Sequence, residues 1–233
     1  MICSKSNINL ATVNLEEKIL NQYTGLNEIY GQVPYQAFVH HMCCEREKKY
    51  KKLLSKKFQT LNQKTMLEIG AGSGDNLFFF NRAGIFLKDI FANELVLERI
   101  EWLGKHFHKE NIIPGNILTV NIDRKFDIIF QSTVFSSVLQ PNDRKAIADR
   151  MKQLLAPDGV ILWYDFTFNN PKNKQVVGIS KKEIKTLFSD ARNIIFKRAT
   201  LAPPIGRRVG EGYNFFNTLF PFFRTHLVAL IEY

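Results

Sequence analysis

The stretch TMLEIGAGSGDN, residues 65–76, decides the fold that we expect for this chain. An apolar segment that contains Glu68 runs into the glycine-rich turn 70–74, and the apolar run 77–80 follows. This order predicts a buried strand, a tight turn and the start of a helix, because glycine adopts positive φ and lets a ligand approach the backbone. Free N–H groups at a helix start favour an anionic or nucleotide-like ligand. A purely structural turn is the alternative, since a bend between strand and helix needs glycine in any case.

Size and composition indicate a globular protein. The chain has 233 residues, of which 45% are hydrophobic and 23% are charged, enough for one large α/β domain with a buried core. No apolar run approaches the ~20 residues that span a bilayer, and the first residues lack the pattern of a secretory signal. Cys3, Cys43 and Cys44 show no metal-ligand spacing and no disulfide framework. We therefore expect a reduced, cytoplasmic protein without a bound metal.

The positive charge is unevenly distributed. The net charge is +10, and residues 45–57, EREKKYKKLLSKK, hold Arg46 and six lysines. Tyr50, Leu53 and Leu54 recur at the spacing of one apolar helix stripe. The pattern favours a helix with a solvated basic face, and a face that binds a polyanion is the alternative.

The order of predicted elements gives the fold class. Helices predicted at 15–23 and 35–57 precede the first strand, so we expect residues 1–60 to form a helical N-terminal cap on a main domain of residues 61–233. From residue 65, strands and helices alternate. The predicted strands are 65–69, 89–93, 111–114, 126–131, 160–166, 192–200 and 225–232, with helices at 75–83, 95–108, 142–156 and 180–189. A long loop is expected before the last strand. This pattern predicts an α/β fold with a doubly wound, seven-stranded, mostly parallel, Rossmann-like sheet, whose ligand lies at the carboxyl ends of the central strands.

Two further loops carry candidate ligand contacts. Asn93 and Glu94 end the second strand, about 20 residues beyond the glycines, where an acid suits two ribose hydroxyls. A helix N-cap carboxylate is the alternative for Glu94. The third strand is followed by Gly115, Asn116 and Ile117. Asn116 can meet an adenine amino group, with Ile117 against the ring.

These motifs resemble those of the class I S-adenosylmethionine-dependent methyltransferases. EIGAGSG matches the family's E/D-x-G-x-G-x-G motif, and residues 126–139 and 154–166 match its fourth and fifth strands with their adjoining turns. The resemblance covers about residues 62–233. It implies that Glu68 helps to place the methionine end of the cofactor and that Glu94 binds ribose. Asn116 stands where the family often has Asp, and Asp158 where it has Gly. The resemblance implies S-adenosyl-L-methionine as cofactor, bound by Glu68, Gly70, Ala71, Gly72, Gly74, Asn76, Asn93, Glu94, Leu95, Asn116, Ile117, Gln131, Ser132 and Thr133.

Other ligand classes fit less well. A dinucleotide-binding G-x-G-x-x-G fingerprint would need glycine at position 75, where the chain has Asp75. Enzymes that methylate base or protein amide nitrogens usually carry D/N-P-P-aromatic after the fourth strand, whereas residues 131–134 are QSTV. We therefore expect a small-molecule acceptor, anionic in one interpretation, and argue against nucleic acid.

The C-terminal half resembles a bacterial methyltransferase subgroup associated with surface-polysaccharide and other small-molecule pathways. This resemblance implies methylation at oxygen of a sugar or sugar-phosphate-like acceptor. An RNA methyltransferase and a non-catalytic S-adenosylmethionine-binding partner subunit are the alternatives. Intact glycines and acids in the cofactor motifs argue against the non-catalytic subunit.

Four residues are candidates for the acceptor side. Asp165, at the end of the fifth strand, could act as general base or cap the following loop through Asn169 and Asn170. His226 could take part in catalysis or lie in the core. Asn170 and Arg207 are candidates for substrate binding, because a guanidinium group suits a phosphate or carboxylate.

An aromatic stretch, YNFFNTLFPFF at 213–223, precedes the last strand. The pattern favours a helix and turn packed on the sheet. A lid over the acceptor, a dimer surface and a contact for a lipid-linked acceptor are the alternatives.

Overall fold

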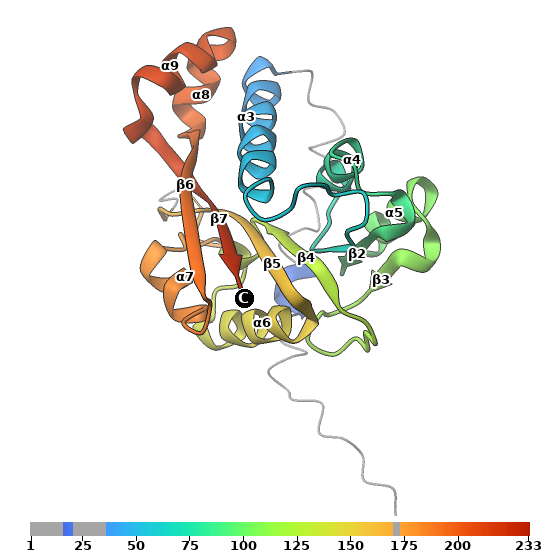
Figure 1. Cartoon of the computed structure of the whole chain (residues 1–233). Coiled ribbons are helices and arrows are strands. Elements are labelled where there is room, and N and C mark those ends of the chain that lie inside the picture. The colour runs from blue at the N-terminus through green and yellow to red at the C-terminus, as the bar shows by residue number, and fades with distance from the viewer. Residues whose placement is uncertain (1–15, 21–35, 170–172) are drawn as a thin grey trace, which may run out of the picture.

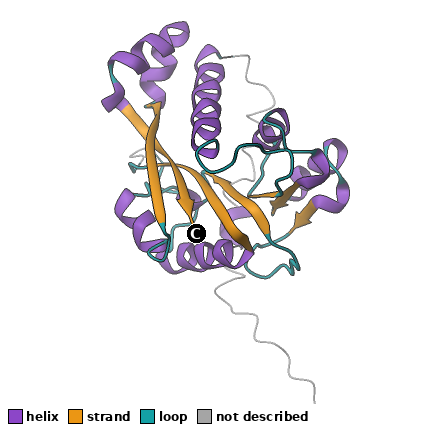
Figure 2. Cartoon of the chain, viewed as in Figure 1, coloured by secondary structure: helices purple, strands orange, loops and turns teal. Residues whose placement is uncertain are grey.

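The computed structural model describes residues 16–20, 36–169 and 173–233, and its centre is one sheet (Figures 1 and 2). The strand order is β3-β2-β1-β4-β5-β7-β6, with β7 antiparallel to both of its neighbours and the other pairs parallel. The predicted seven-stranded, mostly parallel sheet is confirmed. The strands are β1 (Met66–Ile69), β2 (Ile90–Glu94), β3 (Ile112–Pro114), β4 (Phe126–Ser132), β5 (Leu155–Phe166), β6 (Asn193–Leu201) and β7 (Arg224–Glu232).

Helices cover both faces of the sheet. On one face, buried side chains of α6 (Pro141–Leu154) and α7 (Lys181–Leu187) join a core cluster with Trp163. On the other, a second cluster contains Tyr164 with residues of α3 (Ala37–Leu54), α4 (Asp75–Arg82) and α5 (Leu97–His106). The neighbours Trp163 and Tyr164 point into opposite clusters and are both almost fully buried. A strand buried on both faces is typical of a parallel sheet, which explains the continuous apolar run in β5.

The basic segment forms helix α3 and packs against β6 and β7. Tyr50, Leu53 and Leu54 are buried, which confirms the predicted apolar stripe. On its α4 side, Glu47 accepts a hydrogen bond from Arg82 at 3.0 Å. The division into a cap of residues 1–60 and a main domain stays a prediction, because the structure describes only parts of that cap.

The prediction of a long loop before β7 is wrong. That connection folds into α8 (Pro203–Val209) and α9 (Tyr213–Leu219), joined and followed by short 3-10 turns. Pro203 and Pro204 suggested a loop, but proline is favourable in the first turn of a helix, where its missing N–H has no partner to lose. Helix α9 packs against α3 and α8. Figure 1 shows α8 and α9 projecting beyond the end of β6.

Within residues 16–20, 36–169 and 173–233, no helix is long and apolar enough to cross a bilayer. The same ranges contain no group of three or more side chains suited to hold a metal ion.

Candidate active site

The loops that leave β1, β2, β3 and β4 line one cavity of about 910 Å³ at the carboxyl edge of the sheet. Eleven residues expected around the cofactor line it, and Glu68, Gly74 and Gln131 do not. Ile19 adds a contact from the N-terminal segment. The eleven are Gly70, Ala71, Gly72, Asn76, Asn93, Glu94, Leu95, Asn116, Ile117, Ser132 and Thr133.

The glycine turn owes its shape to positive φ angles and close approaches. Gly70 has φ +66°, and a Cβ there would lie 2.7 Å from Cγ2 of Val134. Gly74 has φ +82° and caps α4, and its Cβ would lie 2.9 Å from both Leu103 and Phe107. Gly70 therefore brings two cavity-lining loops together, whereas Gly74 lets α5 pack behind the turn.

Glu94 holds the glycine turn through the backbone. Its Oε2 accepts a hydrogen bond from the Gly72 amide at 2.7 Å, and Oε1 accepts from Leu95 at 2.8 Å and Val96 at 2.9 Å. The carboxylate is only 4% exposed. Glu94 therefore caps the segment that leads into α5, and it also lines the cavity, where a contact with ribose stays a prediction.

Two asparagines order the third loop. Asn93 donates to the carbonyls of Ile113 and Gly115 at 2.9 and 2.8 Å. Asn116 accepts from the Leu118 amide at 3.0 Å, while its buried Nδ2 has no hydrogen-bond partner in the described part of the chain. An unused donor at a cavity wall is suited to a ligand acceptor, since an unpaired buried N–H is costly.

Glu68 lies behind the cavity wall. Its Oε1 accepts from Asn76 at 2.7 Å, and its buried Oε2 has no partner among the described residues. Burial raises the pKa of this carboxyl well above its ordinary value, opposed by the Asn76 hydrogen bond and the charge of Arg46. Arg46 lies over the Tyr164 ring at 5.5 Å, and its buried Nε has no partner in the described ranges. Glu68 thus adjoins the cavity through Asn76, a lining residue, and Arg46 contributes a positive charge that acts on Glu68.

Gln131 uses its side-chain amide for bonds within the protein, and its contact with the cofactor stays a prediction. It is fully buried, donates to the Tyr164 carbonyl at 3.3 Å and accepts from the Val134 amide at 3.0 Å. These bonds hold the loop whose Ser132 and Thr133 line the cavity.

Asp165 does not line the cavity either, and its role as a general base stays a prediction. Its Oδ2 accepts from the Ser136 amide at 3.1 Å and its Oδ1 from the Phe166 amide at 2.9 Å. Burial raises the pKa of this carboxyl to about 7, opposed by the hydrogen bonds from Ser136 and Phe166. These two bonds fit the loop-cap interpretation of Asp165, with Ser136 and Phe166 as its partners among the described residues.

His226 lies among aromatic rings. Its ring stacks on Tyr164 at 5.0 Å and meets Phe166 edge-on at 5.7 Å, and Nδ1 lies 3.1 Å from the Thr225 hydroxyl. Burial lowers the pKa of His226 to about 4, with a further contribution from the charge of Arg46. The core interpretation of this histidine fits the structure better than the catalytic one.

The two substrate candidates gain no support. Asn170 lies outside the described residues. Arg207 is exposed on helix α8 rather than on a stiff loop, and it does not line the cavity.

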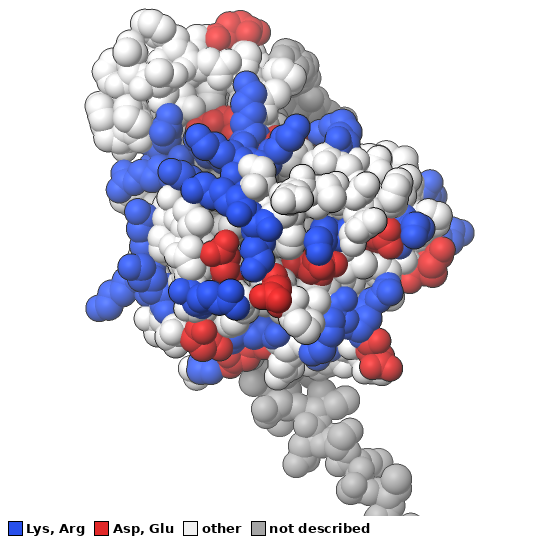
Figure 3. All heavy atoms as spheres, in the orientation of Figure 1, with Lys and Arg blue, Asp and Glu red and all other residues white. Residues whose placement is uncertain are grey.

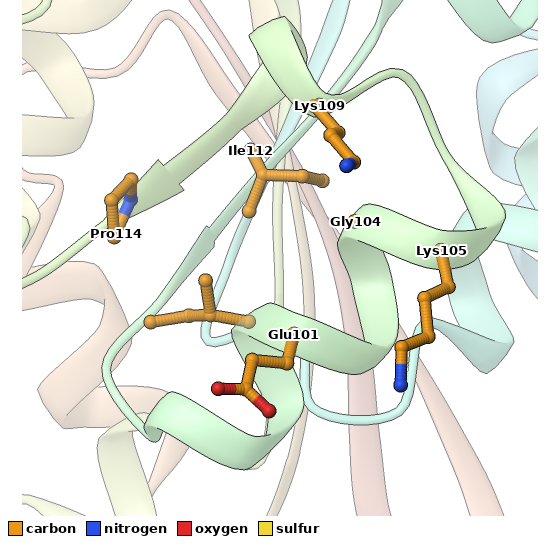
Figure 4. Close-up of a pocket in the computed structure, with 7 residues that line it drawn as sticks. Glu101, Gly104, Lys105, Lys109, Ile112 and Pro114 are labelled. Atoms are coloured by element: carbon orange, nitrogen blue, oxygen red, sulfur yellow. The ribbon is translucent and has the colours of Figure 1, made fainter.

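Trp102, within the helix predicted at 95–108, was not among the residues expected at the site. The ring is 47% exposed and lines the cavity, and its Nε1 donates to the Ser73 carbonyl of the glycine turn at 3.1 Å. A smaller hollow of about 420 Å³ lies beyond α5, between Lys105, Lys109 and Pro114, and is drawn in Figure 4. None of the expected cofactor residues lines that hollow.

With this geometry in place, comparison with known proteins identifies the domain. Residues 67–161 match the family model described as a methyltransferase domain. This match spans less than half of the chain, from β1 into β5, and includes the glycine turn and the loops that line the cavity. A search of curated proteins gives no match in sequence.

Solved structures of methyltransferases share the fold of this chain at low sequence identity. The 1,6-didemethyltoxoflavin-N1-methyltransferase of Burkholderia thailandensis is 14% identical, with TM-score 0.65 over 100% of this chain and 92% of that one. The N-methyltransferase NodS of Bradyrhizobium japonicum, solved with S-adenosylhomocysteine, is 14% identical, with TM-score 0.58 over 96% and 98%. An amino pentose methyltransferase of Micromonospora echinaspora is 12% identical, with TM-score 0.55 over 81% of this chain and 90% of that one.

Proposed function

We propose that this methyltransferase transfers the methyl group of S-adenosylmethionine to a small-molecule acceptor, with the cofactor held in the 910 Å³ cavity. The observation that carries the proposal is the convergence of four loops on that cavity, near two buried polar atoms that have no partner among the described residues, Oε2 of Glu68 and Nδ2 of Asn116. Both atoms fit complementary groups of the cofactor.

The adenosine half suits Glu94, Asn116 and Ile117. A carboxylate oxygen accepts along about two lone-pair directions, so Oε1 of Glu94 is fully used by two amides and Oε2 keeps one direction. We therefore assign Glu94 to one ribose hydroxyl rather than to a bidentate contact. The free Nδ2 of Asn116 suits a ring-nitrogen acceptor of adenine, with Ile117 against the ring.

The methionine half suits Glu68 and Arg46. The cofactor carries an ammonium group and a carboxylate at this end. Oε2 of Glu68 would accept from the ammonium group, and the guanidinium of Arg46 would pair with the carboxylate. Arg46 comes from α3, so this assignment gives the N-terminal basic helix a role in the cofactor site.

The bound cofactor supplies an electrophilic methyl group. The chain then has to hold the acceptor atom in line with that group and exclude water. In this proposal Asp165 and His226 support the loops around the site rather than accept a proton, because both are engaged elsewhere.

The acceptor class rests on resemblance. Two of the structures named above are methyltransferases of small molecules by their titles, one of an amino pentose and one of 1,6-didemethyltoxoflavin. We propose a sugar or sugar-phosphate-like acceptor methylated at oxygen, as in polysaccharide biosynthesis, and a ring or amino nitrogen is the alternative acceptor atom.

The test is transfer of labelled methyl from S-adenosylmethionine to nucleotide sugars, phospho-sugars, amino sugars and total RNA in parallel. Labelled sugar product supports the proposal, and label at nitrogen in amino sugars alone changes only the acceptor atom. Label in RNA alone would overturn the acceptor class. Cofactor binding without transfer to any acceptor would favour a non-catalytic partner subunit.

A further inference from the structure

Helix α9 and the turn after it carry a large exposed apolar surface. Phe215, Leu219 and Phe222 are 65%, 53% and 62% exposed, and Phe216 and Phe223 are 39% and 43% exposed. We call these five residues the aromatic tip. An exposed Phe is ordinary when isolated, but five large apolar side chains within nine positions are not.

The aromatic tip is one continuous surface. Ring centroids of Phe215 and Phe216 lie 6.0 Å apart, Phe216 lies 5.7 Å from Phe220, and Phe220 lies 5.9 and 6.2 Å from Phe222 and Phe223. The opposite side of α9 is buried, with Tyr213 donating to Glu45 of α3 at 2.6 Å. The helix is therefore anchored on one side, and its apolar side faces outward.

Basic side chains border the aromatic tip. Figure 3 shows a mostly uncharged projection, with acidic atoms at its upper edge and with Lys and Arg gathered along its base. The elements that pack together there are α3, β6 and α8. On the α3 side of the sheet and on α8, their exposed cations are Lys48, Lys51, Lys52, Lys197, Arg207 and Arg208, which we call the basic belt.

We propose that the aromatic tip and basic belt bind the surface of a bilayer that contains anionic lipids. Apolar rings enter the boundary between headgroups and acyl chains, while flanking Lys and Arg interact with anionic headgroups. A projecting tip suits this insertion.

Charge argues against a second copy of the chain as the occupant. Pairing two aromatic tips would bring two basic belts together, and like charges at an interface are unfavourable. Anionic lipid instead complements the belt and the net charge of +10. The inference stands apart from the proposed function, because no residue of the tip lines the cofactor cavity.

The experiment is co-sedimentation of the full chain with phosphatidylcholine vesicles, with and without phosphatidylglycerol. We expect binding to the anionic vesicles, weakened at high salt, and little binding to neutral ones. The double variant Phe215→Ser/Phe222→Ser should bind about tenfold more weakly or worse, because binding strength scales with buried apolar area. Phe86→Ser is the matched control, since Phe86 is 53% exposed outside the tip, and it should bind as the wild type does.

A second measurement reports insertion directly. The emission of a Phe222→Trp variant should be quenched by brominated lipid in anionic vesicles well beyond the wild-type signal from Trp102 and Trp163. Equal binding by the double variant, or an unquenched Trp at position 222, would overturn the proposal. A concentration-dependent dimer in light scattering that the double variant abolishes, without vesicle binding by the wild type, would assign the surface to self-association instead.

Discussion

Replacing Glu94 with Gln tests whether this acid supports the glycine turn as well as a ligand. The carboxylate accepts three backbone N–H groups, from Gly72, Leu95 and Val96, at 2.7 to 2.9 Å. A Gln carbonyl can keep the pair at Leu95 and Val96, but its NH₂ group then faces the Gly72 N–H, donor against donor. The variant should therefore lose order in the turn even without cofactor.

The magnitude follows from the lost bond. One hydrogen bond to a charged group contributes about 1.5–3 kcal/mol, and the remaining two weaken when the charge is removed, so we expect a loss of about 2–4 kcal/mol. For a chain of this size, each kcal/mol lowers Tm by about 2–4 °C, which gives a fall of roughly 4–16 °C.

The assay is thermal unfolding of the cofactor-free protein, followed by calorimetric titration with S-adenosylhomocysteine. Glu98→Gln is the control, because Glu98 lines the same cavity and is exposed. It should leave Tm within about 1–2 °C of the wild type, as surface substitutions do. An unchanged Tm for Glu94→Gln would refute the supporting role, even if cofactor affinity fell.

Three further predictions concern single side chains. Glu68→Gln should weaken cofactor binding and make the cofactor affinity less dependent on pH. In the wild type the pKa of the Glu68 carboxyl is raised, so the carboxyl becomes protonated and the affinity falls as the pH falls. Cofactor titrations at several pH values measure this. His226→Phe should remove a loss of stability in acid. The folded pKa of His226, about 4, lies below the unfolded value of 6.5, so the wild type loses about 2 kcal/mol of stability by pH 5 as the pH falls through that window. Urea unfolding of both proteins at two pH values tests this. Gly70→Ala should lower Tm more than Gly72→Ala, since both have positive φ but only the first meets Val134; equal losses would contradict the clash.

The sheet was predictable because its determinants are local. Continuous apolar runs such as that of β5 indicate buried parallel strands, and strand–helix alternation restricts the topology to a few choices. The cavity followed from the same logic, since loops at the carboxyl ends of neighbouring parallel strands meet. Asn93 and Glu94 could be placed at its wall from their position alone.

Side-chain direction was not predictable at strand ends. Gln131 and Ser132 are neighbours at the end of β4, yet the first holds its own loop and the second lines the cavity. A polar residue in that place can bond to a ligand or to the backbone, and the sequence pattern is the same. Asp165 illustrates the same ambiguity at the end of β5.

Tertiary contacts explain the remaining misses. Trp102 follows the apolar spacing of α5, but its ring lies at the edge of the buried side and contacts the glycine turn. Arg46 looked like one more cation of a solvated face, and only the packing of α3 on the sheet brings it to Tyr164.

The central claim is that the loops after β1, β2 and β3 form an S-adenosylmethionine site, and calorimetric titration tests it most directly. S-adenosylhomocysteine should bind the wild-type chain at one site, bind about tenfold or more weakly to Arg46→Met, and fail to be displaced by NAD. No binding of S-adenosylhomocysteine, or binding of NAD in its place, would contradict the account.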